Sequence, residues 1–253
     1  MINRHSKILE VLSKQQRVEV STLSVMLGVS QVTIRKDLDM LEEKGLVIRE
    51  HGCACLDGCE DTGKRIAYHH NIKRRIAKAA AATVSDGDTV MIESGSCCAL
   101  LAEELVLTKK DVTVVTNSVF LANYIRHSPG AKIILLGGYY QPVSQVTVGP
   151  ITRQSAAIFF PSKFFIGADG FSSSFGFTGN DHIRVQTIND LAEHTRGIVV
   201  LTESEKFKHQ GVLGMARTDS VNEVFTDDAI PADAEKILLK HNVIIHKVAA
   251  NES

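Results

Sequence analysis

The chain has 253 residues, of which 44% are hydrophobic and 23% charged, and its formal net charge is −1. This length allows one small and one medium domain, and the absence of any apolar run of about 18 residues predicts no membrane span. The N-terminal stretch MINRHSKILE lacks the apolar core of a secretory signal, so a cytoplasmic protein is expected.

A pair of helices is predicted between Ser21 and Leu46. Apolar residues recur there at helical spacing, first as Leu23, Met26 and Leu27 and then as Ile34, Leu38 and Leu41. The helices are predicted to meet at a turn at Gly28-Val29, and Ser30 stands where an N-cap of the second helix belongs. An earlier helix, from about Asn3 to Lys14, adds an apolar stripe of Ile8, Val11 and Leu12.

The outer face of the second helix carries Val32, Arg35, Lys36 and Asp39. A short helix with a buried back and a basic front fits the major groove of DNA, but any small helical pair also has a charged outside. Two features favour DNA binding: Gly45 ends the helix, and the residues from Leu46 to Arg49 predict a strand that leads to a turn at Gly52. Charge adds little support, because the first 50 residues hold eight Lys or Arg against seven Asp or Glu.

Five cysteines are present, at Cys53, Cys55, Cys59, Cys97 and Cys98. An odd number in a cytoplasmic chain argues against a disulfide framework. Cys53, Cys55 and Cys59 could hold a metal or respond to oxidation, but their spacing is not that of a usual metal site. We therefore predict no metal and no cofactor, and interpret these cysteines as small residues of a linker.

The next predicted helix runs from about Tyr68 to Val84, with Ile72, Ile76, Ala80 and Thr83 on one face. Lys73, Arg74 and Arg75 lie in its first turns. They could contact DNA phosphates, but a solvated helix face is the preferred interpretation.

From Thr89 onward, short β-branched or apolar runs alternate with helical stretches. The predicted strands are Thr89–Glu93, Val112–Thr116, Lys132–Leu136, Phe164–Ala168, Gly197–Thr202, Glu223–Thr226 and Val243–His246. The predicted helices are Cys97–Val106, Val119–Arg126, Ile183–Thr195 and Pro231–His241. This alternation predicts βαβ units and a mainly parallel sheet covered on both faces.

Small and polar residues follow five of these strands, where open parallel sheets bind their ligands. Ser94-Gly95-Ser96 opens a helix, so free backbone N–H groups and the helix dipole favour an anion there. Asn117 and Asp169 suit sugar hydroxyls, and Lys206 could complete a phosphate site. Each loop alone could be an ordinary βα turn, but together they favour a crevice for a phosphorylated polar ligand.

Several motifs in this order resemble the DeoR family of bacterial transcriptional regulators. They are Ser30–Leu38 (SQVTIRKDL), Gly45–Gly52 (GLVIREHG), Ser94–Ser96, Thr116-Asn117-Ser118, Leu136-Gly137-Gly138, Gly167-Ala168-Asp169-Gly170 and Lys206-Phe207. The resemblance implies an N-terminal winged helix-turn-helix and a C-terminal α/β sensor domain similar to ribose-5-phosphate isomerase. It also implies a sugar phosphate or related metabolite as inducer, usually of a repressor that controls a catabolic operon.

The resemblance also implies the site residues. DNA would be contacted by Ser30, Gln31, Val32, Thr33, Arg35, Lys36 and Arg49. The effector would be bound by Ser94, Gly95, Ser96, Thr116, Asn117, Gly138, Asp169 and Lys206. The chain departs from the family pattern at Glu93, at Glu205 beside Lys206, and at Ile188, where the family usually has lysine, so the effector is expected to differ from a typical sugar phosphate or to bind more weakly.

The expected organisation is a winged helix-turn-helix domain at residues 1–57, a linker at 58–69 and an α/β effector-sensing domain at 70–253. The expected function is a repressor of a carbohydrate catabolic operon, a homodimer or homotetramer that binds double-stranded operator DNA and a small-molecule effector, rather than an enzyme. Two alternatives remain: a sugar-phosphate isomerase with Asp169 or Glu93 as its base, and a regulator that responds to thiol oxidation or metal.

Overall fold

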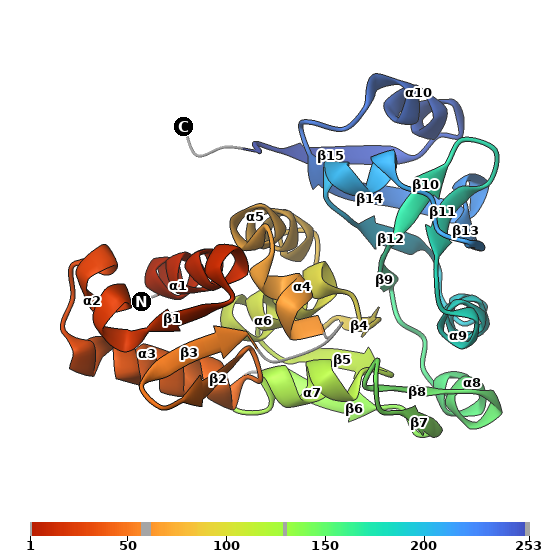
Figure 1. Ribbon diagram of the computed structural model, residues 1–253. Helices are drawn as coiled ribbons and strands as arrows, with labels where there is room; N and C mark the ends of the chain where they lie inside the picture. The colour runs from red at the N-terminus through yellow and green to blue at the C-terminus, as the bar shows by residue number, and fades with distance from the viewer. Residues whose placement is uncertain (1, 57–61, 129–130, 251–253) are drawn as a thin grey trace. The chain divides into compact units, whose positions relative to one another are not determined.

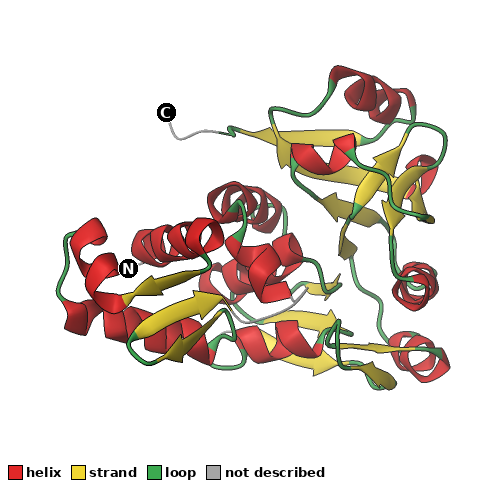
Figure 2. Cartoon of the chain, in the orientation of Figure 1, coloured by secondary structure: helices red, strands yellow, loops and turns green. Residues whose placement is uncertain are grey.

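A computed structural model describes residues 2–56, 62–128 and 131–250 (Figure 1). The chain forms two compact units, residues 1–71 and 72–253. The first is a small helical unit with a three-stranded sheet, and the second is an α/β unit (Figure 2). The predicted fold class is therefore confirmed.

The first unit contains the predicted helix-turn-helix and its wing. Its elements are α1 (Ile2–Gln15), β1 (Arg17–Glu19), α2 (Val20–Leu27), α3 (Gln31–Glu43), β2 (Val47–Glu50), β3 (Cys53–Leu56) and α4 (Thr62–Ala67). The strands pair antiparallel in the order β1-β3-β2. His51 and Gly52 both have positive φ, as a tight two-residue hairpin turn requires, and this turn forms the tip of the wing.

Helix α3 is positioned as its sequence predicts. The Thr33 backbone N–H donates to Ser30 Oγ at 3.2 Å, which is the expected N-cap. Ile34 and Leu38 are fully buried. On α2, the predicted apolar face is confirmed at Leu23, which is buried together with Val20, and is wrong at Met26, which is 51% exposed.

The segment expected to be an irregular linker, residues 58–69, contains helix α4. Ile66 is fully buried, and a Cβ on Gly63 would lie 2.9 Å from the carbonyl oxygen of Gly45. This close packing explains the helix: one turn with two apolar residues is too short to give a periodic signal, and its stability comes from tertiary contact. Residues 57–61 lie outside the described ranges.

A buried carboxylate on α3 joins it to α1. Arg4 forms an ion pair with Asp37, donating from Nη2 at 2.8 Å, and His5 Nε2 lies 3.1 Å from the same carboxylate. Asp37 is 2% exposed. Burial alone would raise the pKa of Asp37, but the hydrogen bonds from Arg4 and His5 lower it below its usual value. Burial lowers the pKa of His5.

This cluster predicts acid lability of the first unit. Both pKa values are depressed in the folded state, so the unfolded chain binds more protons and stability falls as pH falls. The loss should begin below about pH 6.5, where unfolded His5 protonates, and continue below about pH 4, where unfolded Asp37 does. Asp37→Asn should remove about 2 kcal/mol at pH 7 and flatten the acid limb. Urea unfolding from about pH 2.5 to pH 8 measures both effects, and an unchanged loss of stability below about pH 4 in the variant would refute the assignment of Asp37.

The second unit is built on a seven-stranded parallel sheet. Its strands are β4 (Thr89–Ile92), β5 (Val112–Thr116), β6 (Ala131–Leu135), β9 (Lys163–Gly167), β12 (Ile198–Leu201), β14 (Val221–Asp227) and β15 (Ile244–Val248), and they lie in the order β15-β14-β12-β9-β4-β5-β6. These are the seven strands predicted from the sequence. Phe164, Phe165 and Val200 are fully buried, as the strands of a sheet covered on both faces should be.

Helices and small hairpins connect these strands. The helices are α5 (His70–Ala81), α6 (Ser96–Thr108), α7 (Val119–Ile125), α8 (Pro150–Ala156), α9 (His182–Ala192), α10 (Ala232–Lys240) and the 3₁₀ turns η1 (Ser204–Lys208) and η2 (Thr218–Ser220). Two further sheets were not predicted: the pair β7 (Tyr139–Gln141) and β8 (Val146–Val148), and the triplet β10 (Gly170–Ser172), β11 (Gly176–Gly179) and β13 (Leu213–Arg217).

The sheet order places a topological switch between β4 and β9. The chain runs outward from β4 through β5 to β6, then returns to add β9 on the other side of β4. The strand order therefore reverses at this point, and open α/β sheets bind their ligands at such switch points.

Candidate functional site

The exposed face of α3 carries unpaired cations. Val32 is 60% exposed, and Arg35 and Lys36 are exposed with no hydrogen bond or ion pair within the described part of the chain. Ser30 and Gln31 are exposed beside them. The predicted DNA-contact residues of α3 therefore share one solvent-facing surface, apart from the half-buried Thr33.

Arg49, on the wing, is placed differently. It forms an ion pair with Asp39 of α3, and its backbone N–H donates to Glu42 Oε1 at 3.0 Å. These contacts tie β2 to the recognition helix. Arg49 therefore supports the wing, and Asp39 partly neutralises its charge.

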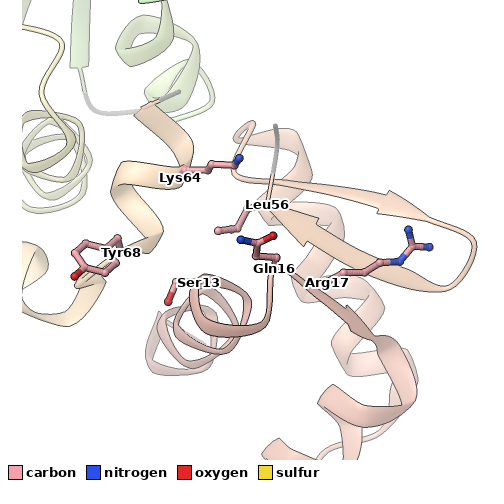
Figure 3. A pocket seen from close by; sticks show the side chains of 6 residues that line it. All are labelled: Ser13, Gln16, Arg17, Leu56, Lys64 and Tyr68. Atoms are coloured by element: carbon pink, nitrogen blue, oxygen red, sulfur yellow. The ribbon is translucent and has the colours of Figure 1, made fainter. Parts of the chain in front are cut away.

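A pocket of about 410 Å³ lies in the same unit (Figure 3). Ser13 and Gln16 of the α1 end, Leu56 of β3, and Lys64 and Tyr68 line it together with Arg17. Figure 3 shows the Arg17 guanidinium directed away from Gln16 and Leu56, and Arg17 pairs with Glu50 at 3.4 Å. The two cations that line the pocket are Arg17 and Lys64, and only Lys64 could direct its charge at a ligand. The polar side chains therefore do not converge on one point, and we assign the pocket no ligand.

The interpretation of Cys53 and Cys55 as linker residues is wrong, because both lie on the wing strand β3, which pairs with β1 and β2. Cys53 and Cys55 are half-buried free thiols, and a hydrogen bond to Cys53 raises the pKa of Arg17. Cys59 lies outside the described residues. Among the described residues, no group of three His, Cys, Asp or Glu side chains could hold a metal ion.

The loops after β4 and β9 approach each other closely at Gly95 and Gly167. A Cβ on Gly95 would lie 3.1 Å from the Cα of Gly167. Any side chain at either position would force the two loops apart, so glycine is required by this close approach. Gly95 is also the N-cap of α6, so the first N–H groups of that helix face this meeting point.

A buried ion cluster, not predicted from the sequence, lies beside this close approach and joins the residues that follow β4 and β9. Arg184 of α9 donates from Nε to Glu93 Oε1 at 2.6 Å and from Nη2 to Glu93 Oε2 at 2.9 Å. Its Nη1 donates to Asp169 Oδ2 at 3.3 Å. Burial alone would lower the pKa of Arg184, but Glu93 and Asp169 raise it further above its normal value. Arg184 is therefore permanently charged and joins the ends of β4 and β9.

Several predicted effector residues are used by the fold itself. Ser94 Oγ donates to Glu93 Oε1 at 2.6 Å. Thr116 is fully buried, donates to the Ile92 carbonyl at 2.6 Å and accepts from the Ser118 N–H at 3.0 Å. Thr116 thus fixes the loop after β5 and has no hydroxyl hydrogen left for a ligand.

Asn117 has an available acceptor. Its Nδ2 donates to the Thr147 carbonyl at 3.0 Å, while its Oδ1 is buried without a partner among the described residues. A buried unpaired amide oxygen is costly, and ligand sites often contain such groups.

The remaining predicted residues lie in three different loops. Ser96 is buried in the first turn of α6. Gly138 has φ +149°, and a Cβ there would lie 2.0 Å from Thr152 Oγ1. Lys206 is half-buried in η1, which is anchored by Phe207 against Phe171 and Phe177, with ring centroids 5.3 and 6.0 Å apart.

Two of the three cations at the start of α5, which were interpreted as a solvated helix face or a possible DNA contact, are bound within the second unit. Lys73 is 3% exposed and its Nζ lies 3.1 Å from Glu203 Oε1, while Arg75 Nη2 donates to the Ala250 carbonyl at 2.6 Å. The predicted solvated face is therefore wrong at Lys73, and the half-buried Arg75 is held by a carbonyl of the second unit. No local pattern in the sequence indicates the partner of Lys73, because Glu203 lies 130 positions away.

A helix-turn-helix with a wing, followed by an α/β unit with buried charged residues at its topological switch, fits a DNA-binding regulator that carries a sensor domain. The family model described as a DeoR-like helix-turn-helix domain matches residues 4–58, and that described as a DeoR C terminal sensor domain matches residues 68–228. The chain belongs to the DeoR family of transcriptional regulators, so the resemblance is confirmed. No helix within the described ranges is long and apolar enough to cross a bilayer.

Similar proteins span almost the whole chain. A putative aga operon transcriptional repressor of Escherichia coli O157:H7 is 29% identical over 248 residues, covering 95% of this chain and 91% of that protein. The glycerol-3-phosphate regulon repressor of Escherichia coli K12 is 28% identical over 243 residues, covering 95% and 96%. Among solved structures, ribose 5-phosphate isomerase A of Methanocaldococcus jannaschii has a TM-score of 0.40 at 18% identity over 55% of each chain, too distant to bear on chemistry.

Proposed function

We propose that this regulator represses a carbohydrate catabolic operon and releases its operator when a phosphorylated sugar or related metabolite binds the second unit. The observation that carries the proposal is the exposed, unpaired Arg35 and Lys36 on a helix whose back is fully buried. In the major groove, Arg35 would donate to a guanine edge and Val32 would meet a thymine methyl. Lys36, Ser30, Gln31 and Thr33 would contact phosphates or bases, with Arg49 supporting the wing.

The effector site would lie at the β4–β9 switch point. The N-terminal turn of α6 supplies N–H groups for an anion, and Lys206 on η1 supplies a cation. Asn117 Oδ1 and Asp169 would accept hydrogen bonds from ligand hydroxyls. Ser94, Gly95, Ser96, Thr116 and Gly138 would shape the site, Thr116 by holding its own loop. The two relatives, an operon repressor and a glycerol-3-phosphate regulon repressor, support a metabolite of this class.

The buried ion cluster supports an effector that differs from a common sugar phosphate. Ile188, at the position of the usual lysine, is 1% exposed and belongs to the apolar core. Arg184, one turn earlier on α9, brings its charge to the crevice but is bound to two carboxylates. Glu205 adds a further negative charge beside Lys206. A ligand that pairs its anion with hydroxyl or amino donors fits beside such a cluster better than a bare dianion does.

The enzyme alternative is less well supported. Glu93 is fully buried with both oxygens bound to Arg184, and Asp169 accepts from Arg184 and, at 3.2 Å, from the Asn180 N–H. Oxygens already engaged by a buried guanidinium and a backbone N–H are poorly placed to take a proton from a substrate. Their arrangement supports a binding site over an isomerase base.

A homo-oligomer is part of the proposal. The stretch 135–162 contains a single charged residue, Arg153, which pairs with Glu193 of the same chain at 2.5 Å. Within it Tyr139 is 71%, Val143 76% and Ile151 61% exposed. An apolar surface without net charge can face its own copy across a two-fold axis without repulsion. Light scattering should report two or four chains per particle, and a single chain would contradict this part.

A thermal-shift screen of phosphorylated sugars and phosphorylated sugar acids tests the proposed effector class. At a hundredfold excess over Kd, a ligand stabilises the fold by about 2.7 kcal/mol. For a protein of this size, that corresponds to a rise in Tm of about 5 °C or more. The non-phosphorylated sugars are the matched controls. A screen in which only non-phosphorylated compounds raise Tm would refute the phosphate part of the proposal.

A further inference from the structure

The first turns of α5 are anchored inside the sensor unit by an ion pair. Lys73 Nζ lies 3.1 Å from Glu203 Oε1, and the two side chains are 3% and 6% exposed. The boundary between the two compact units falls between residues 71 and 72. Lys73 is therefore one of the first residues through which the sensor unit can hold the chain that comes from the DNA-binding unit.

Glu203 belongs to the proposed effector site on its other side. It follows β12 directly and precedes η1, which carries Lys206. Its Oε2 accepts a hydrogen bond from Cys97 Sγ at 3.9 Å, and Cys97 is the second residue of α6. A single carboxylate thus contacts α5 through one oxygen and the anion-binding turn of α6 through the other.

An anion bound at this turn would act on the pair electrostatically. It would place negative charge near the Glu203 carboxylate in a poorly solvated interior, where charges interact more strongly than in water. Repulsion would displace Glu203, and Lys73 would be attracted toward the anion. Either response moves the first turns of α5 relative to β12, because both side chains are too buried to exchange their partner for water.

We propose that the Lys73–Glu203 pair is the contact through which occupancy of the crevice reaches α5 and hence the DNA-binding unit. This inference rests on the proposed function, since it needs a DNA-binding output and a ligand at the crevice. It assigns regulation to a lysine whose sequence context suggested only a surface charge. Lys73 and Glu203 act as positioning residues in this scheme, not as ligand contacts.

Reciprocity allows a test that needs no identified effector. If a ligand bound at the proposed effector site changes the affinity for DNA, then bound DNA must change the affinity of that site for its ligand. The coupling free energy is the same in both directions. The probe is a duplex that the intact protein selects from a random pool. Hydrogen–deuterium exchange is measured with and without this duplex, and the readout is the change at residues 203–208 and at the α6 start, residues 95–99.

Four proteins are compared: wild type, Lys73→Met, Glu203→Gln and Lys163→Met. Lys163 provides a matched control, because it also pairs with a glutamate, Glu223, at 2.7 Å, but at the start of β9. The duplex should change exchange at the crevice loops at least twofold in wild type and in Lys163→Met. The change should be lost in Lys73→Met and in Glu203→Gln, with DNA still bound.

The outcomes separate the two levels of the account. A wild-type protein that selects no duplex would refute the proposed function itself. DNA binding without any change at the crevice, or an unaltered change in Glu203→Gln, would overturn the assignment of the pair while leaving the DNA-binding function intact. Glu203→Gln keeps the shape of the side chain, so the test remains decisive should Lys73→Met fail to fold.

Discussion

Replacing Arg184 with methionine is expected to lower the free energy of unfolding of the second unit by about 3–5 kcal/mol. The reason is that Glu93, fully buried, would lose both of its charge-assisted hydrogen bonds and remain as an uncompensated interior charge. Urea unfolding followed by circular dichroism measures the loss. Arg217→Met is the matched control: Arg217 pairs with Asp219 at the surface, with side chains 68% and 55% exposed, and its loss should cost under about 1 kcal/mol.

A double variant separates the charge from the shape. Adding Glu93→Gln to Arg184→Met removes the stranded carboxylate, so the double variant should be more stable than Arg184→Met alone. A single variant as stable as wild type would show that the cluster does not hold the ends of β4 and β9 together.

Replacing Arg35 with alanine is expected to abolish selective DNA binding. An arginine that reads a base edge contributes about 1–3 kcal/mol of selectivity, and an oligomer loses that contribution at each half-site. Two half-sites at about 1 kcal/mol each give a loss of roughly 30-fold in affinity for the selected duplex. Fluorescence anisotropy with labelled duplex measures this at fixed salt, since phosphate contacts make all such affinities salt-dependent.

Two variants serve as controls for Arg35→Ala. Lys14→Ala removes an exposed cation of α1 that pairs with Glu10, and it should leave selectivity unchanged. Arg35→Lys keeps the charge but loses the two-pronged donor, so it should retain non-selective binding and lose discrimination. If Arg35→Ala and wild type bind the selected duplex with equal affinity, Arg35 does not contact a base edge in the major groove.

The sequence pattern predicted the long elements well, because each buries a regular run of apolar side chains that is visible in the sequence. The seven parallel strands are apolar runs between turn residues, and all seven were found. The strands that escaped are three to five residues long, such as Tyr139–Gln141 and Gly176–Gly179, and they depend on pairing with distant segments. Helix α4 escaped for the same reason, because its stability comes from packing and not from its own pattern.

The loops of the proposed site could be predicted from the sequence, but its buried charged side chains and their partners could not. Ser94-Gly95-Ser96 and Asp169 are recognisable in the sequence as turn residues that follow strands. The structure brings those two loops together. Arg184, Lys73 and Asp37 look like ordinary surface charges in helices, since a sequence does not state which helix face is buried. Their partners lie 91, 130 and 33 positions away. Pairing at that separation is fixed by the fold, so only the structure reveals it.

The most direct test of the central claim is the affinity for the selected duplex, measured with and without the compound that raises Tm most in the screen. An effector-responsive repressor should bind the duplex at least about tenfold more weakly when the compound is saturating. The paired measurement, affinity for the compound with and without duplex, should change by the same factor. Equal duplex affinity with and without a compound that binds the sensor unit would contradict the account.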